Sequence, residues 1–563
     1  MTNIVFEARV KIRKSLQSAI RSGVDDGIFP DDAAPINFII EIPADSSHGD
    51  FATNIAMLYA KPFNMTPRKI AEEIVGRIEI DAEYFEKAEV AGPGFINFRL
   101  KRRWFSYAVK KALEDGGNYG RSSYGGGKKV VVEFVSANPT GPMHMGNARG
   151  GALGDSLAAA LDFAGYLVSR EFYINDAGSQ IAKFAKSLEA RYLQIFKPET
   201  PFPEDGYQGG DIKDLARQFA DIHGDEYLDK DEKLRQDIMI AFALPRNIEK
   251  LKADLGTYRV FYDVWFSEKS LHESGAVERA LGLLGDNGYT YEKDGALWYK
   301  STAFGEEKDE VLVRANGIPT YFAADIAYHY DKLAVRGFDK AINVWGADHH
   351  GHVARMKNAM KAMGLDSSRL DVVIMQMVNL VRDGKPVRMS KRTGRAISLA
   401  DLLEEVPIDA ARFFFNMRDP ASHLDFDLDL AIEESNNNPV YYVQYAYARI
   451  CSIVKNLAAE GIESRETSLD ELDLLSSGEE RELIRHVAVL PDEIIAAAEQ
   501  YDPAKLTRYC IELAARFHKF YNNCYIRGEA EPLLQARLAL CLCVKNVIEN
   551  VFGMLKITAP ESM

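Results

Sequence analysis

The segment from Val130 to Gly154 limits the possible folds of this chain more than any other part of the sequence. It begins with an apolar, β-branched run, Val130–Val135, which has the length and composition of a buried strand. A loop rich in proline and glycine follows, and a helical pattern of apolar residues starts near Asn147. This order of strand, loop and helix N-terminus commonly binds phosphate groups, because free backbone N–H groups and the positive end of the helix dipole point at the anion. The segment therefore predicts a nucleotide-binding α/β domain.

The residues of the loop are suited to contact a nucleotide. His144 and Asn147 carry N–H donors that can reach phosphate oxygens. Gly146 has no side chain, so a flat base or a phosphate can approach the backbone closely. The spacings G-x-x-x-x-G-K and G-x-G-x-x-G are both absent, so the loop is neither a P-loop nor a dinucleotide fingerprint. A strand-to-helix turn with an incidental histidine is the alternative interpretation.

The residues around His144 carry a family resemblance. They read PMHMGN and resemble the HIGH signature of class I aminoacyl-tRNA synthetases, with Met145 and Asn147 as variants. The preceding stretch, EFVSANPTGP, has the form that this region takes in arginyl-tRNA synthetases. The resemblance implies that this loop binds ATP and supplies two catalytic residues, His144 and Asn147. The residues implied to contact ATP here are Pro142, His144, Gly146 and Asn147.

A second motif follows a predicted strand and turn, Val378–Pro386. It reads RMSKRTG and resembles the KMSKS motif, the other signature of class I synthetases. In amino-acid activation a carboxylate attacks the α-phosphate of ATP, so cationic donors on the phosphates lower the barrier. Lys391 occupies the second lysine position and is expected to be catalytic, whereas Arg388 keeps the charge of the first lysine but not its shape. The residues of this motif expected to bind ATP are Arg388, Met389, Ser390 and Lys391. A basic surface loop is the alternative.

The stretch GIPTYFAADIA, which starts at Gly317, indicates the amino-acid substrate. It opens a predicted helix on which Tyr321 and Asp325 are four residues apart and share a face. In arginyl-tRNA synthetases a Tyr and an Asp at this spacing hold the guanidinium group of arginine, whose fork of donors is best met by carboxylates. The resemblance therefore implies that role for these two residues. The alternative is that Asp325 pairs with His329, one helical turn further on.

The resemblance adds further residues to the substrate pocket. Glu133 and Asn138 match family positions that line the arginine site, with Asn138 near the α-amino group. The segment WGADHHGH after a predicted strand resembles the family segment beneath ATP and the amino acid, so Asp348 and His349 are expected to contact ATP, and His349 also arginine. An Asp and three His in this segment suggest a metal site as the alternative, but adjacent histidines project differently, and we expect no protein-bound metal.

Composition patterns divide the chain into several domains. Residues 1–115 are expected to form a small α+β domain, whose segments 47–61 and 91–100 resemble the additional N-terminal domain of arginyl-tRNA synthetases, which contacts the tRNA elbow. Residues 116–400 alternate β-branched runs with helical patterns, which predicts a parallel sheet with strands at 130–135, 341–345 and 372–377. This Rossmann-like catalytic domain of the α/β class contains a helical insertion at about 190–290, for which the sequence suggests no function. Residues 401–435 connect it to the last domain.

Residues 436–563 are helical in pattern and resemble the all-helical anticodon-binding domain that arginyl- and cysteinyl-tRNA synthetases share. Four tyrosines near its start are either core of the helical bundle or aromatic surfaces on which anticodon bases stack. They are Tyr441, Tyr442, Tyr445 and Tyr447.

Composition is that of an ordinary soluble globular protein. Apolar residues make up 47% and charged residues 27% of the 563 residues. No run of about 18 apolar residues and no apolar signal-peptide region is evident, so we expect a cytoplasmic protein without membrane contact. The net charge of −15 argues against nucleic acid, but a tRNA needs only a local basic path, for which segments 11–14, 101–103 and 388–395 are candidates. The alternative is that these segments are solvated surface.

The sequence is identified as a member of the arginyl-tRNA synthetases. The family resemblance implies a monomer that makes arginyl-adenylate from L-arginine and ATP with Mg²⁺, and then transfers arginine to the terminal adenosine of tRNA-Arg. It also implies that activation requires bound tRNA. Cysteinyl-tRNA synthetase uses a Cys/His zinc site, and the first of the five cysteines here is Cys451, so no zinc is expected. Glutamyl- or glutaminyl-type enzymes would require a cation in place of Asp325. A non-catalytic RNA-binding paralogue would not need His144, Gly146 and Lys391, and a small-molecule adenylate former would not need two RNA-facing domains.

Overall fold

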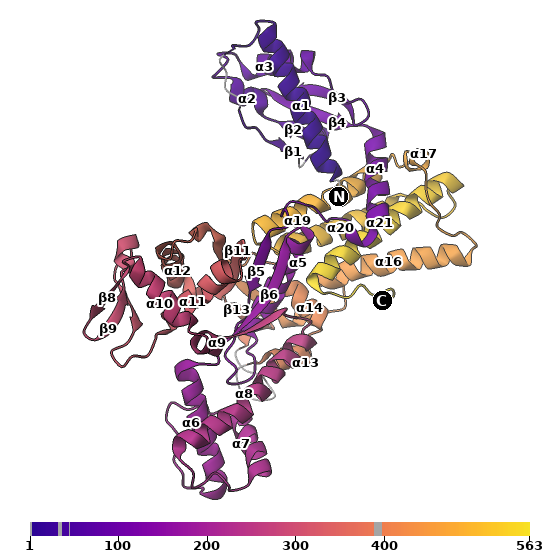
Figure 1. The fold of residues 1–563 in the computed structure, drawn as a ribbon. Coiled ribbons are helices and arrows are strands. Elements are labelled where there is room, and N and C mark those ends of the chain that lie inside the picture. Colours follow the sequence, from indigo (N-terminus) through magenta and orange to yellow (C-terminus); the bar gives the residue numbers. More distant parts are fainter. Residues whose placement is uncertain (1–2, 32–35, 44, 388–396) are drawn as a thin grey trace.

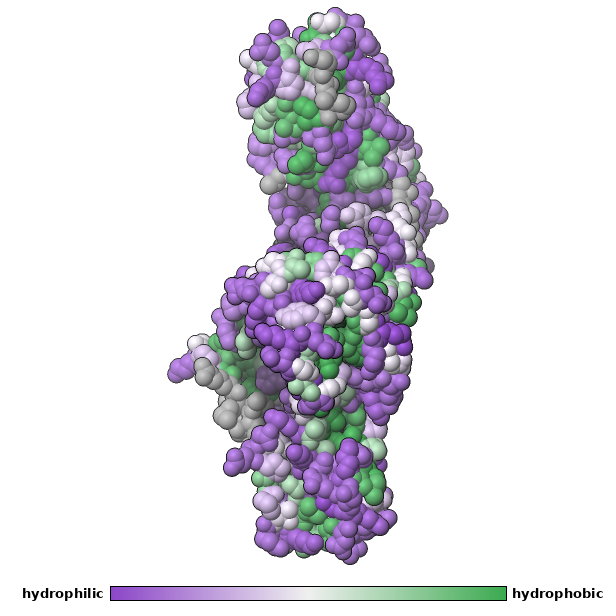
Figure 2. Space-filling view, turned by 60° about the vertical axis from the view of Figure 1, so that its left-hand side comes forward, coloured by the Kyte–Doolittle hydropathy of each residue, from purple (hydrophilic) through white to green (hydrophobic). Residues whose placement is uncertain are grey.

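The structure is a computed structural model that describes residues 3–31, 36–43, 45–387 and 397–563. The molecule is elongated (Figure 1): the N-terminal domain lies at the top, a parallel sheet at the centre, a helical arm at the bottom, and the C-terminal helices at the right. Hydrophilic residues cover most of the face in Figure 2, and apolar residues form separate patches between them.

The N-terminal domain packs helices against an antiparallel sheet with strand order β1-β2-β4-β3. Helix α1 begins after Asn3, whose side chain accepts hydrogen bonds from the backbone N–H groups of Val5 and Phe6. In the central pairs, Phe98 of β4 lies opposite Phe51 of β2. The elements are α1 (Ile4–Asp25), β1 (Ile40–Glu41), β2 (Phe51–Thr53), α2 (Ile55–Tyr59), α3 (Pro67–Arg77), β3 (Phe85–Ala91) and β4 (Phe95–Leu100).

Helix α4 (Arg102–Asp115) connects this domain to the rest of the chain. Its buried residues include Trp104 and Phe105, and it packs against helices α18 and α21 of the C-terminal bundle. The side chain of Ser106 donates a hydrogen bond to Asp473 (2.6 Å). α4 is therefore part of the interface with the bundle, although the sequence pattern groups it with the N-terminal domain.

The central sheet is parallel and has the strand order β12-β11-β5-β6-β7, which confirms the predicted α/β class. From β5 the chain proceeds through β6 and β7 in one direction, and β11 and β12 lie on the other side. In open parallel sheets, ligands bind at the carboxyl ends of the strands where the order reverses, here between β5 and β11. The strands are β5 (Lys129–Glu133), β6 (Leu167–Ile174), β7 (Val264–Ser267), β11 (Lys340–Gly346) and β12 (Leu370–Met375).

Helix α5 (Gly146–Phe163) follows β5 and packs closely on the end of that strand. A Cβ atom at Gly154 would lie 2.2 Å from the ring of Phe134, so this approach requires a glycine. The other face of α5 contacts α19 and α21 of the C-terminal bundle.

Two excursions leave the sheet. Between β6 and β7, α6 (Gly178–Phe196), α7 (Gly210–His223) and α8 (Glu232–Thr257) form an arm with its own apolar core, at the bottom of Figure 1. Strand β7 therefore lies inside the range 190–290 that the sequence pattern assigns to a helical insertion. The second excursion consists of α9 (Glu268–Glu273), α10 (Ala276–Asp286), β8 (Thr290–Lys293), β9 (Ala296–Tyr299), β10 (Glu310–Val313), α11 (Tyr321–Tyr330) and a π-helix (Asp331–Val335).

After β12 the chain forms a small sheet with strand order β14-β13-β15 and then the helical bundle. Helix α21 is long and apolar enough to cross a membrane, but 72% of its most apolar window is buried inside the protein. Helix α12 (His350–Ala362) lies between β11 and β12. The elements after β12 are β13 (Val378–Arg382), β14 (Lys385–Val387), α13 (Leu399–Glu405), α14 (Ile408–Phe415), β15 (Leu424–Asp427), α15 (Leu428–Ile432), α16 (Pro439–Ala459), α17 (Leu469–Leu472), α18 (Gly478–Ala488), α19 (Leu490–Glu499), α20 (Ala504–Asn523) and α21 (Glu531–Leu555).

Candidate active site

The loop before α5 is paired with the segment that follows the second motif. His144 and Ser398 form an antiparallel bridge. Two backbone hydrogen bonds flank it, from Met145 N–H to the Ile397 carbonyl (3.0 Å) and from Leu399 N–H to the Met143 carbonyl (2.8 Å). Two stretches far apart in the sequence are thereby held side by side at the carboxyl end of β5. The predicted ATP-binding residues Arg388, Met389, Ser390 and Lys391 lie outside the described residues.

His144 projects from this paired segment toward solvent. Met143 and Met145 are buried, and His144 between them is exposed, as expected for an extended backbone. The backbone N–H of Gly146 donates to His144 Nδ1 (3.0 Å), so Nδ1 is the acceptor and the neutral ring carries its proton on Nε2. Nε2–H is therefore available as a donor to a bound anion, beside the N-terminus of α5. Pro142 is exposed and Asn147 half-buried in the same loop.

Arg149 in the first turn of α5 was not identified from the sequence. Its guanidinium is fully buried and donates to backbone carbonyls of Gln376 (2.7 Å), Asp419 (3.0 Å) and Ser422 (3.0 Å). Burial lowers the pKa of Arg149 to about 10. These bonds fix the start of α5 to the chain just before β13 and β15. A charged residue within an otherwise apolar helical pattern was the available signal.

Tyr321 and Asp325 lie on the first two turns of α11, as predicted. The Tyr321 hydroxyl is 2.9 Å from Ser179 Oγ on α6. The Asp325 carboxylate contacts His352 Nε2 (3.1 Å), whereas His329 Nδ1 bonds the backbone carbonyl of Asp325 (2.7 Å). The alternative pairing of the Asp325 carboxylate with His329 is therefore not what the structure contains.

Glu133 and Asn138 end β5 and begin the loop. The buried Glu133 carboxylate accepts from Lys332 Nζ (2.6 Å) and from Ser136 Oγ (2.9 Å). Asn138 is exposed, and its side-chain amide lies 3.3 Å from that of Asn175, which follows β6. Both predicted pocket residues are thus at the carboxyl edge of the sheet, but the charge of Glu133 is already matched by a lysine.

Glu268, at the start of α9, is a second residue that sequence reasoning missed. It is 3% exposed, and the Asn175 amide lies 2.9 Å from its carboxylate. Burial, together with the charges of Asp325 and Asp176, raises the pKa of Glu268 to about 7. The carboxylates of Glu268 and Asp325 therefore repel one another near Asn138. A bound cation would relieve this repulsion. Its position directly after a short apolar run was the signal available in the sequence.

Asp348 and His349 form a 3₁₀ turn after β11, next to the end of β5. Both are exposed, and His349 Nε2 lies 3.4 Å from the Asp348 carboxylate. The ring of Trp345 lies 6.1 Å from that of His349 and 5.6 Å from that of His352. Within the described part of the chain, no group of three or more His, Cys, Asp or Glu is placed to hold a metal ion.

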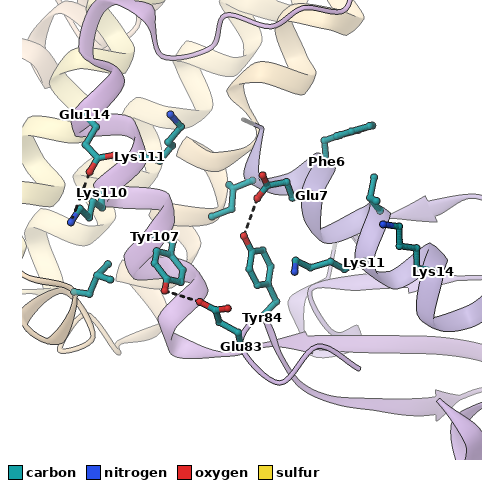
Figure 3. A pocket seen from close by; sticks show the side chains of 13 residues that line it. Phe6, Glu7, Lys11, Lys14, Glu83, Tyr84, Tyr107, Lys110, Lys111 and Glu114 are labelled. Carbon is teal, nitrogen blue, oxygen red and sulfur yellow. Dashed lines mark hydrogen bonds and ion pairs between the residues drawn. The ribbon is translucent and has the colours of Figure 1, made fainter. Parts of the chain in front are cut away.

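A separate hollow lies where the N-terminal domain meets α4 (Figure 3). This junction cavity, of about 840 Å³, is lined by side chains of α1, of the residues just before β3, of α4 and of α17. Tyr84 donates to Glu7 (2.9 Å) and Tyr107 donates to Glu83 (2.8 Å) across it. Four lysines line it, Lys11, Lys14, Lys110 and Lys111. Two residues of the predicted basic segment 11–14, Lys11 and Lys14, thus line this cavity, together with Glu7, Glu83 and Glu114.

Comparisons with known proteins match this architecture in every part. The family model for the catalytic domain of class I (R) tRNA synthetases matches residues 108–425. The model for the arginyl tRNA synthetase N terminal domain matches residues 8–100, and that for the DALR anticodon binding domain matches residues 443–563.

Individual relatives agree with these matches. The arginine–tRNA ligases of Caldanaerobacter subterraneus subsp. tengcongensis and Ruminiclostridium cellulolyticum are each 54% identical to the chain, over 563 and 565 residues. Each match covers 100% of this chain and 100% of the relative. The solved Thermus thermophilus arginyl-tRNA synthetase has the same fold, with a TM-score of 0.75 and 22% identity, over 98% of this chain and 100% of that one. The chain belongs to the arginyl-tRNA synthetase family of class I aminoacyl-tRNA synthetases.

Proposed function

We propose that the protein is an arginine–tRNA ligase. It activates L-arginine with ATP to arginyl-adenylate and transfers the arginine to the 3′-terminal adenosine of tRNA-Arg, releasing pyrophosphate and AMP. The observation that carries this proposal is the pairing of residues 143–145, in the first motif, with residues 397–399, which follow the second motif in the sequence.

In the activation step an oxygen of the arginine carboxylate attacks the α-phosphorus of ATP, and the bond to pyrophosphate breaks. His144 Nε2–H is a free donor beside the positive end of the α5 dipole, so we assign to it the stabilisation of charge that develops as pyrophosphate leaves. Lys391 would supply a further cation. Mg²⁺ enters with ATP and neutralises phosphate charge. Pro142, Gly146, Asn147, Asp348, His349 and the motif residues 388–390 complete the proposed ATP contacts.

Selection of arginine rests on charge and hydrogen bonding at the start of α11. Asp325 supplies a carboxylate for the guanidinium group, and Tyr321, which is 40% exposed, supplies a hydroxyl oxygen as a further acceptor. A cation buried near two carboxylates gains charge-assisted hydrogen bonds, whereas an acidic substrate would be repelled. Asn138 binds the α-amino group at the other end of the substrate, with Glu133 and His349 as the remaining proposed contacts.

The two outer domains provide tRNA contacts. We assign residues 1–115 to the elbow and residues 436–563 to the anticodon, with residues 401–435 as the connection. In the helical domain Tyr447 is buried and donates to Glu549 (2.5 Å), whereas Arg449 lies over the rings of Tyr445 and Tyr521 and leaves Tyr445 half-exposed. Stacking on anticodon bases is therefore assigned to Tyr445, and a core role to Tyr447. The enzyme works as a cytoplasmic monomer.

The test is amino-acid-dependent exchange of pyrophosphate into ATP, with and without tRNA. The full-length protein should catalyse exchange with L-arginine and tRNA-Arg, and should attach labelled arginine to that tRNA. Cysteine, glutamate and glutamine serve as competing substrates, because they are the substrates of the related enzymes considered above. Exchange with one of these in place of arginine, or charging of no tRNA, would refute the proposal.

A further inference from the structure

A continuous chain of buried polar groups runs beneath the proposed arginine pocket. It starts at α11, where His329 Nδ1 donates to the backbone carbonyl of Asp325 (2.7 Å). The side chain of Asn343 on β11 donates to His329 Nε2 (2.6 Å), and its Oδ1 accepts from Lys332 Nζ (3.1 Å). Lys332 Nζ also donates to Glu133 (2.6 Å) at the end of β5. The chain therefore joins three elements that surround the pocket.

The chain continues from Glu133 into the loop that presents Asn138. Ser136 Oγ donates to the second oxygen of Glu133 (2.9 Å) and accepts from the backbone N–H of Tyr173 on β6 (3.2 Å). Asn138 lies two residues after Ser136. The two proposed contacts at opposite ends of the substrate, Asp325 and Asn138, are thus connected by hydrogen bonds and a short piece of loop.

Burial makes the donors and acceptors of this chain unambiguous. Lys332 and Asn343 are 0% exposed, His329 2% and Glu133 6%. Burial and the charge of Lys332 hold the pKa of His329 well below its usual range, so the ring is neutral and can accept on Nε2 while it donates from Nδ1. Each group is then satisfied in one orientation only, which makes the chain rigid.

The loop at one end of this chain has an unfavourable backbone. Val135 has a φ of 72° and Ser136 a φ of 46°, so two consecutive residues with side chains occupy the left-handed region. A β-branched residue such as valine is rarely found there, and such backbone persists only where surrounding contacts enforce it. Here Ser136 Oγ is held by its hydrogen bonds with Glu133 and with the backbone N–H of Tyr173, and the Ser136 N–H donates to the Phe134 carbonyl (3.1 Å).

The cation in the chain is placed by a local change of helix geometry. Helix α11 ends at Tyr330 and continues as the π-helix Asp331–Val335, which carries Lys332. Single π-turns are uncommon in α-helices and frequently occur at functional sites. The Lys332 ammonium group lies 4.0 Å from the centre of the Tyr328 ring, which completes its surroundings.

We propose that Lys332 is a positioning residue that sets the distance between the two ends of the arginine pocket. Through Glu133 and Ser136 it holds the loop that presents Asn138, and through Asn343 and His329 it ties that loop to Asp325. Lys332 does not touch the substrate. Lys332 instead helps the enzyme to select substrates by the length of their side chain, because it keeps the guanidinium contact and the α-amino contact at one fixed separation. This inference rests on the proposed function.

The test compares arginine with homoarginine, which is one methylene longer, in full-length Lys332→Met. Networks of this kind change coupling by amounts that correspond to about 2- to 30-fold in affinity. We expect the variant to bind arginine more weakly by such a factor in calorimetry, and the ratio of kcat/KM for arginine over homoarginine to fall in tRNA-dependent exchange. The KM for ATP should stay within about twofold of the wild type, since a uniform structural defect would affect both substrates.

Ser136→Ala provides a second variant that leaves no buried charge unpaired, so it keeps the test valid if Lys332→Met does not fold. It should shift the same ratio in the same direction. Lys340→Met is the matched control, because Lys340 pairs with Asp371 (2.5 Å) at the opposite end of β11; its ratio should equal that of the wild type. Unchanged arginine affinity and an unchanged ratio in folded Lys332→Met and Ser136→Ala would overturn the inference. If the wild type itself does not require arginine, the proposed function fails instead.

Discussion

The backbone N–H of Gly146 is bonded to Nδ1 of His144, and this contact decides which ring nitrogen of the histidine can meet a phosphate. A Cβ atom at position 146 would lie 3.1 Å from that nitrogen, so a side chain there would require the ring to shift by a few tenths of an ångström. Gly146 therefore orients the histidine, in addition to the close approach of ATP that we propose for this position.

This orientation predicts the effect of removing the imidazole. His144→Ala should lower kcat for exchange on the order of 10²-fold or more with a smaller change in KM for ATP, because the donor acts on charge that develops in the transition state. Lys391→Ala should behave in the same way. His144→Gln, which keeps a distal amide donor, is expected to retain more activity than His144→Ala. Turnover near the wild-type value with only a raised KM for ATP would contradict this role.

Asp325 should determine the preference for a cationic substrate. Asp325→Asn keeps the shape of the side chain but leaves the guanidinium incompletely paired. The value of kcat/KM for arginine should therefore fall by a factor that corresponds to roughly 2–5 kcal/mol of transition-state stabilisation. The KM for ATP in the same variant is the internal control and should change little. Normal charging of tRNA with arginine by Asp325→Asn would place the essential carboxylate elsewhere, and Glu268 would be the next residue to test.

Glu268 gives a prediction about stability and pH. Its pKa in the folded protein is raised to about 7 from the usual 4.5, so between these values the folded state binds more protons than the unfolded state, and stability contributed by this group declines as pH rises. Glu268→Gln should therefore be more stable than the wild type at pH 8 by about 1–3 kcal/mol, with little gain at pH 5. Thermal unfolding without arginine at both pH values measures this difference.

The same substitution should weaken arginine binding, because the guanidinium loses one of two nearby carboxylates. A gain in stability joined to a loss of affinity distinguishes a binding residue from a purely structural one. Glu273→Gln on the same helix is the control, since the Glu273 side chain is exposed and pairs with Lys269 at 3.2 Å on the protein surface. Equal unfolding temperatures of Glu268→Gln and wild type at pH 8 would argue against electrostatic repulsion between Glu268 and Asp325.

The N-terminal domain should add tRNA affinity without taking part in chemistry. Deleting residues 1–100 rather than 1–115 preserves α4, whose Trp104 and Phe105 are buried at the bundle. The truncated protein, once circular dichroism has established that it is folded, should have a raised KM for tRNA and recover exchange at high tRNA concentration. Its tRNA affinity should also depend less on salt. The slope of log affinity against log salt concentration should be shallower by about 0.7 to 0.9 for each phosphate group that the deleted domain would have neutralised. An unchanged affinity and slope would exclude contact between this domain and RNA.

The sequence predicted the strands that consist mainly of apolar residues. The strands expected at 130–135, 341–345 and 372–377 are confirmed as β5, β11 and β12, within two residues at each end. β5 ends before Val135, which leaves the extended region. β6 was not predicted because Arg170 and Glu171 interrupt its apolar pattern. These charges are compensated by Asp155 and Arg336, which are distant in sequence, so local patterning carries no sign of them.

The site residues divide in the same way. Motif residues such as His144, Tyr321 and Asp325 can be located by spacing alone, and their roles stay predictions. Arg149, Glu268 and Lys332 depend on partners that only the fold brings near, namely backbone carbonyls, a second carboxylate and the end of β5. A buried charge is informative once its counterpart is known, and that counterpart is set by tertiary structure.

The pairing of residues 143–145 with residues 397–399 also has a consequence for synthesis on the ribosome. A nascent chain that has emerged only through β7 contains His144 but lacks both β11 and the segment that binds alongside the histidine. Its nucleotide site is incomplete, because residues 397–399 have not been made. The backbone carbonyls that accept hydrogen bonds from Arg149 of α5 are also missing. The catalytic centre is therefore completed late during translation, and a chain released early has no competent site with which to sequester ATP or arginine.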